Sequence, residues 1–181
     1  MVYRSVAEIL HMITDTHQRL SGRVTGLRAE QEIFQPETGG WTIAQITEHL
    51  GIVAGQFLRL TNKLLAQAEA AGAQASPDLR ISLVTLPTAA TSPDEKMKAP
   101  ESALPGGQAS VAESMAKIRQ AHEALLALRP RLEAADLSQA TLPHFTFGTL
   151  NLYQWLMLIG VHEQRHIRQI EALMASPGFP A

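Results

Sequence analysis

Two histidines one helical turn apart are the residues of this chain whose type and spacing most directly suggest chemistry. They are His162 and His166, within LIGVHEQRHIRQI at residues 158–170, and they match the H-E-x-x-H pattern of zinc proteases. Residues i and i+4 share one face of a helix, so both imidazoles can hold one ion. Two neutral imidazoles on an apolar face leave ring nitrogens that apolar neighbours cannot satisfy, and a shared cation removes this difficulty. The pair therefore predicts a metal site.

A zinc protease of this type would need a third ligand after the pair, and the chain does not supply it in the expected place. The compact protease pattern requires a histidine at position 172, where this chain has Ala172, and a glycine where it has Gln169. The looser pattern takes a glutamate from a following helix, but Glu171 belongs to the same helix as the pair. The zinc protease is therefore the least favoured of the enzyme interpretations.

The better third ligand is His49, in TEHLGIVAGQF at residues 47–57. At about 100° per residue, His49 falls about 60° from the middle of the apolar stripe of its helix, where a side chain can line a cleft between helices. We therefore predict that His49, His162 and His166 bind one divalent metal ion. Three imidazoles leave coordination positions open, as in catalytic zinc sites. Nitrogen ligands suit zinc, nickel or iron, so the identity of the ion stays open.

Four other side chains near these histidines are weaker candidates. Glu163 could act as a general base, and it could equally be solvated or hold a ligand in place. Gln45 and Gln56 lie near His49 in the sequence, and Gln169 lies one helical turn past the pair. Each of these glutamines could orient a histidine or contact a substrate.

The remaining histidines are expected to have no metal role. His17 and His122 each stand alone on an apolar stripe, which predicts hydrogen-bonded core residues. His11 falls off its stripe and is expected to be solvated. His144, in LPHFTFG, could lie at a pocket rim, and we favour an ordinary loop residue.

Four helices are expected to position these side chains. Apolar residues recur at alternating steps of three and four over residues 5–34, 43–71, 111–135 and 152–174, as in helices with one buried face. Each start has a capping signal: Ser5 with Glu8, Thr42 with Gln45, Ser110 with Glu113, and Asn151. The sequence thus predicts an all-α fold.

The connection between the second and third helices, residues 72–108, is rich in proline, so no long helix fits there. ISLVTL, at residues 81–86, suggests a short extended piece. The length of the connection predicts a crossover and a four-helix bundle of up-down-down-up order. In that order His49 lies roughly 10 Å and His166 roughly 12 Å from the same end of the bundle. Simple antiparallel order would place His166 roughly 22 Å away, so the crossover and the three-histidine site support each other.

Composition narrows the class of protein further. The chain has 181 residues, 45% of them hydrophobic, a formal net charge of −2 and no cysteine. We expect one domain spanning residues 1–181, without disulfides or the basic patch that nucleic acids and anionic membranes require. No apolar run reaches the roughly 18–20 residues that cross a bilayer. We expect a cytoplasmic protein that acts on a small-molecule substrate and that could form a homodimer.

Three motifs together resemble the DinB-like (YfiT-type) superfamily. They are WTIAQITEHL at residues 41–50, FGTLNLYQWL at residues 147–156 and HEQRHIRQI at residues 162–170. The resemblance covers most of the chain, from the first helix to Leu173, and residues 72–108 are its least typical part. It implies an up-down-down-up four-helix bundle, in agreement with the crossover.

The resemblance also implies three metal-binding histidines, one on the second helix and a His-x-x-x-His pair on the fourth, which correspond to His49, His162 and His166. Some relatives are transferases or isomerases that use bacillithiol, mycothiol or glutathione, where the metal activates the thiol. Others are called metal-dependent hydrolases. The expected function is a metal-dependent enzyme of thiol-transferase or hydrolase type, with a low-molecular-weight thiol as a further cofactor. The alternative is a non-catalytic ligand-binding or interaction bundle with a vestigial metal site.

Overall fold

The computed structural model describes residues 2–37, 39–72, 74–75, 81–82 and 99–181. Most of these residues are helical, in agreement with the predicted all-α class. The long helices are α1 (Val6–Val24), α3 (Ile43–Ala70), α5 (Val111–Ala127) and α7 (Leu152–Met174). The short ones are α2 (Ala29–Glu32), the 3-10 turn η2 (Glu101–Ala103) and α6 (Arg129–Ala134). Two small antiparallel sheets pair β1 (Val2–Tyr3) with β2 (Ile81–Ser82), and β3 (Thr141–His144) with β4 (Gly148–Asn151).

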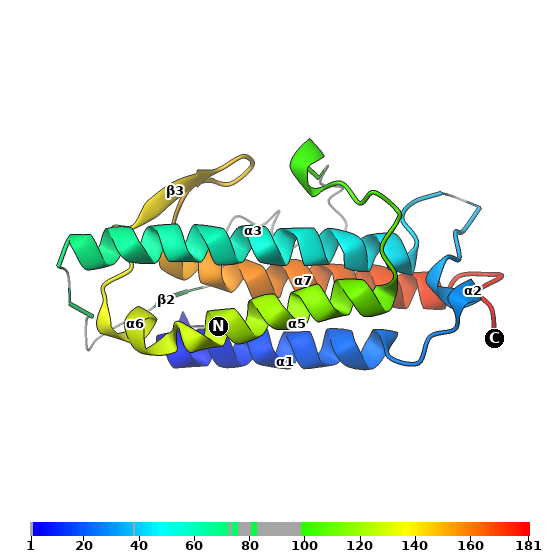
Figure 1. The fold of residues 1–181 in the computed structure, drawn as a ribbon, viewed down its shortest axis with the longest axis horizontal. Helices are drawn as coiled ribbons and strands as arrows, with labels where there is room; N and C mark the ends of the chain where they lie inside the picture. Colours follow the sequence, from blue (N-terminus) through cyan, green and yellow to red (C-terminus); the bar gives the residue numbers. More distant parts are fainter. Residues whose placement is uncertain (1, 38, 73, 76–80, 83–98) are drawn as a thin grey trace.

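The helices α1 and α7 lie side by side and run in the same direction (Figure 1). Arg19 of α1 donates a 2.7 Å hydrogen bond to Gln164 of α7. Further along both helices, Arg23 forms a 2.8 Å ion pair with Glu171. The contacts thus advance together along the two helices, which requires a parallel pair.

The helices α3 and α5 also run parallel to each other, opposite in direction to α1 and α7 (Figure 1). Near their starts, a Cβ placed at Gly51 of α3 would lie 3.4 Å from the Ser114 carbonyl oxygen of α5, so the glycine allows a close approach. Past the end of α5, Arg131 forms a 2.7 Å ion pair with Glu69 of α3. The two helices therefore stay in contact over most of their length.

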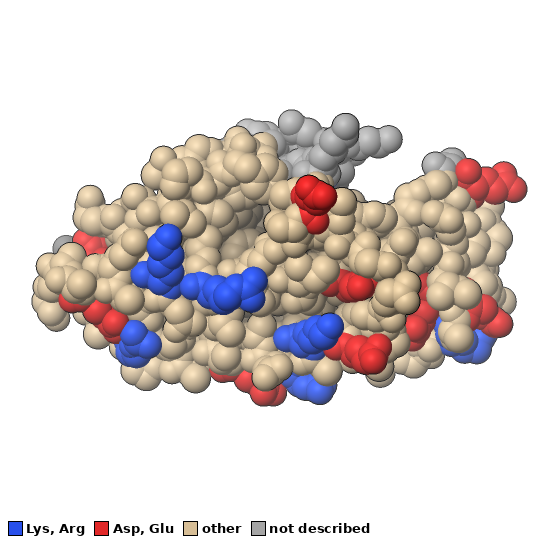
Figure 2. All heavy atoms as spheres, turned by 45° about the horizontal axis from the view of Figure 1, so that its top comes forward, with Lys and Arg blue, Asp and Glu red and all other residues tan. Residues whose placement is uncertain are grey.

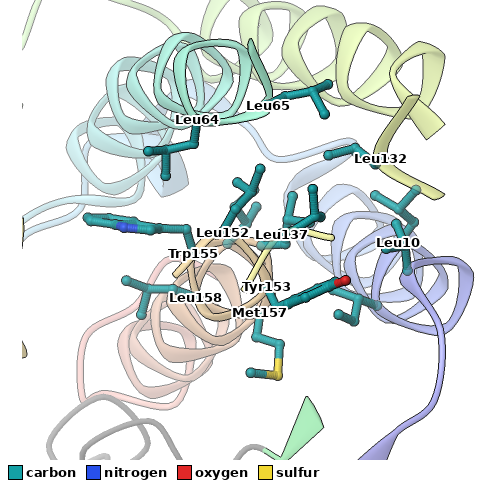
Figure 3. Close-up of a cluster of buried hydrophobic side chains, with 14 of the residues drawn as sticks. Leu10, Leu64, Leu65, Leu132, Leu137, Leu152, Tyr153, Trp155, Met157 and Leu158 are labelled. Carbon is teal, nitrogen blue, oxygen red and sulfur yellow. The ribbon is translucent and has the colours of Figure 1, made fainter. Parts of the chain in front are cut away.

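The core lies between these helices, and α7 is its central element. Figure 3 shows leucines of α1, α3 and α6 converging on apolar side chains from the first two turns of α7. The buried residues of these turns are Leu152, Tyr153, Trp155, Leu156, Met157 and Leu158. Full burial of one large apolar side chain stabilises the fold by about 1.5–3 kcal/mol. Packing therefore anchors the helix that carries the histidine pair.

The second and fourth helices have the predicted bounds to within one residue, whereas the first and third are shorter than predicted. The first, α1, ends at Val24 because Gly26 takes the left-handed backbone region at φ 80°. The third, α5, ends at Ala127, and Pro130 lies in the first turn of the separate helix α6. Proline cannot donate a backbone hydrogen bond inside a helix, which explains the break.

The predicted capping interactions are present on three helices and half present on the fourth. The caps of α3, α5 and α7 are Thr42, Ser110 and Asn151, each closed by a reciprocal bond from the third residue of its helix. At α1, Ser5 Oγ accepts the Glu8 N–H at 3.1 Å, as predicted. The Glu8 carboxylate, however, accepts the N–H of Arg4 at 2.6 Å instead of that of Ser5.

Replacing Ser110 with alanine should lower the free energy of unfolding by about 1 kcal/mol. The Ser110 hydroxyl accepts the Glu113 N–H at 3.2 Å, and alanine leaves that donor at the start of α5 without a side-chain partner. Urea unfolding followed by circular dichroism measures the loss. Gln120→Ala, at an exposed position of the same helix, is the control and should change stability by only a few tenths of a kcal/mol. Equal losses in both variants would remove the cap as the cause.

A hairpin stands where the sequence suggested a loop. The strands β3 and β4 pair from Thr141↔Asn151 to His144↔Gly148, and Gly148 takes φ 73° at the end of the turn. The indole Nε1 of Trp155 donates to the Leu142 carbonyl at 3.3 Å. This bond ties the hairpin to the first turn of α7.

Most of the predicted crossover, residues 72–108, lies outside the described residues, as do residues 83–86 of the predicted extended piece. Residues 81–82 of that piece form β2. The last part of the connection is described and contacts α3. Gln56 donates to the Ser102 carbonyl at 2.9 Å, and Glu48 accepts the Gly107 N–H at 2.7 Å. These bonds hold the segment before α5 against the helix that carries His49.

The surface carries charges of both signs. Figure 2 shows basic and acidic side chains interspersed over the face that it views, without one extended basic patch. Among the described helices, none combines the length and hydropathy that crossing a bilayer requires.

Candidate metal centre

The three predicted metal ligands come together between α3 and α7. The Nε2 atom of His162 lies 3.2 Å from Nε2 of His49 and 3.2 Å from Nε2 of His166. The ligand atoms of all three lie within 4.8 Å of one another. In the part of the chain that the structure describes, this is the one group of histidine and acidic side chains with metal-binding spacing.

In His49 and His166, a hydrogen bond at Nδ1 determines that Nε2 is the atom available to a metal ion. The Nδ1–H of His49 donates to the Ala103 carbonyl at 2.6 Å, and the Nδ1–H of His166 donates to Gln169 Oε1 at 2.7 Å. A neutral imidazole carries one proton, so Nε2 of each of these rings presents a lone pair. Both lone pairs face His162 Nε2, whose single proton could satisfy at most one of them.

The nitrogens fit a divalent cation. Metal–nitrogen bonds of about 2.0–2.1 Å place two tetrahedral ligands about 3.3 Å apart, close to the 3.2 Å of both neighbouring pairs. Lone pairs that face one another repel, and a cation between them converts the repulsion into attraction. Both the spacing and the chemistry of the donor set therefore support a metal ion, without selecting among zinc, nickel and iron.

Burial keeps these imidazoles in the form that binds metal. Desolvation lowers the pKa of His166 to about 3, lowers the pKa of His162 well below its ordinary value and lowers that of His49 as well. The other histidines of the cluster lower the pKa of His162 and His166 further. The rings are thus neutral at neutral pH, and a proton does not compete with a metal for their lone pairs.

Trp41 closes one side of the cluster. Its ring lies 5.0 Å from that of His49, and it stacks at 15° on the ring of His166 with centroids 6.5 Å apart. Trp41 also packs against the apolar cluster that contains Ile46. Because Trp41 lies roughly two helical turns before His49, the sequence spacing could have indicated that it contacts the histidine cluster.

The histidines form part of the wall of a cleft of about 900 Å³. Its apolar lining includes Val53, Phe57, Leu60, Phe147, Trp155 and Leu158. Its polar lining includes the three histidines together with Gln56, Arg165 and Gln169. Small-molecule sites typically have about 300–1,000 Å³ and a mostly apolar lining with a few polar groups. The cleft thus has room for a small molecule beside the Nε2 atoms.

Two of the three candidate glutamines line this cleft. Gln169 accepts the Nδ1–H of His166, as described above, and Gln56 donates to the Ser102 carbonyl. Gln45 does not line the cleft, because its Oε1 accepts the Thr42 N–H at 3.0 Å in the capping box of α3. The described bond of the Gln45 side chain is therefore a helix cap.

Glu163 faces away from the cleft. It follows His162 directly, so it is turned about 100° around α7. It lines a separate cavity of about 20 Å³ together with Ile118 and His122 of α5. Its Oε2 has no hydrogen-bond partner among the described residues, and burial raises the pKa of its carboxyl to about 8. The structure therefore places Glu163 in this second cavity and not in the wall of the cleft.

The other histidines have mixed surroundings. His144 lies in β3 and lines the cleft, whereas we favoured an ordinary loop residue. The half-buried rings of His17 and His122 stack at 4.8 Å, and His122 Nε2 lies 3.1 Å from Thr14 Oγ1. The expected hydrogen bond is thus present for His122, whereas Nδ1 of His17 has no partner in the described structure. His11 is exposed, as predicted.

Replacing Gln169 with leucine should weaken metal binding by about 10–100-fold without unfolding the protein. Leucine keeps a similar volume but cannot accept the Nδ1–H of His166, so the ring loses the bond that fixes its tautomer and orientation. A competition titration against a zinc-sensitive dye measures the affinity. Gln164→Leu, on the same helix and outside the cleft, is the control. An equal loss of affinity in both variants would point to a disturbed helix.

No curated protein and no solved structure shows significant similarity to this chain. The family model of the DinB superfamily matches residues 12–170, which include all three histidines of the cluster. The match extends from α1 to the last turns of α7 and covers most of the chain. The chain therefore belongs to the DinB superfamily.

Proposed function

We propose that this protein is a divalent-metal-dependent enzyme of thiol-transferase or hydrolase type, acting on a small molecule in the cleft. The observation that carries the proposal is the convergence of three imidazole Nε2 nitrogens on the wall of a cleft of about 900 Å³. Structural zinc sites normally take four protein ligands, and the described residues offer three here. Such a donor set leaves coordination available to a substrate.

The fold proposed behind this site is an up-down-down-up four-helix bundle, in which residues 72–108 cross from the end of α3 to the start of α5. Two parallel pairs support it, α1 with α7 and α3 with α5. In this order α3 and α7 are antiparallel, which agrees with the contacts of His49 with His162 and of Phe57 with Trp155.

A metal bound there would lower the pKa of a coordinated water or thiol. The residues of the chain would supply the setting for that chemistry. His49, His162 and His166 hold the ion, while the Ala103 carbonyl and the Gln169 amide keep two of the rings in the metal-binding tautomer. A substrate bound against the apolar walls would displace water, which would strengthen electrostatic interactions beside it.

Metal analysis followed by activity assays tests this proposal. Thiol transfer would be assayed with glutathione, bacillithiol or mycothiol and 1-chloro-2,4-dinitrobenzene, and hydrolysis with p-nitrophenyl acetate. We expect about one bound ion per chain and a turnover that is lost on chelation and restored by a divalent ion. A bound ion without turnover in either assay would favour the non-catalytic ligand-binding alternative. A protein that binds no divalent ion would contradict the proposal altogether.

A further inference from the structure

An aromatic surface forms one wall of the cleft. The rings of Phe145 and Phe147 each stack on His144 with centroids 4.4 Å apart, at interplanar angles of 25° and 14°. Trp155, in the first turn of α7, adds a fourth ring 5.3 Å from His144. All four residues line the cleft, and we refer to them as the hairpin platform. Stacked aromatic rings of this kind favour a flat apolar ligand.

The hairpin platform also offers one polar atom in a fixed state. Nδ1 of His144 accepts the backbone N–H of Thr146 at 3.0 Å and that of Phe147 at 3.2 Å. The proton of the neutral ring must then lie on Nε2, which makes Nε2 a hydrogen-bond donor. No residue in the described part of the chain accepts from it. The platform therefore combines an apolar surface with a donor suited to an oxygen of the ligand.

Arg165 is the one side chain with a permanent charge among the described residues that line the cleft. It directly precedes His166 in α7 and lines the same cleft as the three histidines. A guanidinium has five N–H donors, so it can keep a partner within the protein and still donate to a ligand. Its planar fork matches the two oxygens of a carboxylate.

We propose that the cleft takes a small carboxylate with a flat apolar body, of the aryl-alkanoate kind. The body lies on the hairpin platform and the carboxylate is held by Arg165. This inference names the substrate class of the site and so rests on the proposed function. It follows from the pairing of an aromatic wall with a single cation, since neither acidic side chains nor a second basic group line the described cleft.

Intrinsic fluorescence can report the binding, because both tryptophans of the chain, Trp41 and Trp155, line the cleft. The probes are 3-phenylpropionate, its neutral amide 3-phenylpropionamide, and propionate. Each is titrated into metal-loaded protein and into protein stripped with a chelator. We expect 3-phenylpropionate to bind about tenfold more tightly than either other probe in both forms, because only this probe engages both the platform and the cation.

Substitutions separate the two contacts. Arg165→Met should weaken 3-phenylpropionate binding by about tenfold and leave the amide unchanged, and Arg165→Lys should restore part of the loss. Arg168→Met, at an exposed position of the same helix, is the matched control and should bind like the parent. Phe145 is 67% exposed, so Phe145→Ala should leave the fold intact. This variant should weaken both phenyl probes and leave propionate unchanged.

Three results would overturn the inference. They are equal affinity for the acid and its amide, a preference for the acid that survives Arg165→Met, and a preference that exists only in the metal-loaded protein. The last would place the carboxylate on the ion. Metal content, measured separately by emission spectroscopy, tests the proposed function. A protein without metal that still binds 3-phenylpropionate through Arg165 would refute the enzyme proposal and retain the ligand class.

Discussion

Replacing His49 with alanine should abolish tight metal binding while leaving the helical fold nearly intact. His49 brings the nitrogen from α3, and the remaining pair on α7 would hold an ion by two ligands only. We expect the metal content after dialysis to fall from about one ion per chain to near zero. The affinity should fall by about 10³-fold or more, because structural and catalytic sites alike need at least three protein ligands for tight binding.

The fold should survive this change because packing holds the helices together. Side chains such as Leu64, Leu152 and Leu156 are fully buried in the core, and each contributes about 1.5–3 kcal/mol. A bundle with such a core differs from a zinc finger, which folds only with its ion. Stripping the metal from the parent should therefore lower Tm by mass action and leave unfolding cooperative.

Circular dichroism and metal analysis on the same samples check this prediction. His11→Ala is the matched control, because His11 is exposed, pairs with Asp15 and lies away from the cluster. It should keep both its helical signal and its metal. An unfolded His49→Ala protein would show that the site is structural, and the enzyme proposal would lose its main physical support. A variant that retains metal would point to a different third ligand.

The three histidines could be predicted because the spacing of residues along a helix determines which face each side chain occupies. The spacing of His162 and His166 fixes their common face, and the apolar stripe around His49 fixes its phase relative to the core. The carbonyl of Ala103, which orients His49, could not be predicted. Its position depends on where residues 99–108 settle on α3, and no periodic pattern encodes that.

The hairpin platform was missed for a related reason. Each strand of the hairpin has only four residues, too few for alternation to outweigh the loop signals of Pro143 and Gly148. His144 therefore suggested a loop residue, although its strand places it in the cleft wall. Glu163, in contrast, could have been placed from sequence, because a residue that follows a ligand on a helix is turned about 100° away from it.

Replacing Glu163 with methionine should stabilise the protein by about 3 kcal/mol at pH 7. The carboxyl lies among apolar side chains such as Ile118 and Leu125, and its Oε2 has no hydrogen-bond partner in the described residues. Burial raises its pKa from the ordinary 4.5 to about 8. At pH 7 the carboxyl is therefore protonated in the folded protein but ionised in the unfolded chain. This difference lowers the free energy of unfolding by about 3 kcal/mol. Methionine has a similar volume and a flexible chain that can fill the adjoining cavity.

The pH dependence distinguishes this cause from improved packing. Well below pH 4.5, Glu163 is protonated in the folded and the unfolded chain, so its burial carries no charge cost there; the cost grows as pH rises and is complete above about pH 8. The stability gained by Glu163→Met, measured by urea unfolding, should therefore be small at pH 4 and largest near pH 8. Glu37→Met, at an exposed position outside the helices, is the control and should leave stability nearly unchanged at each pH. Both variants should keep their metal, because Glu163 faces away from the cleft. A gain in stability that does not change with pH would exclude charge burial as its origin.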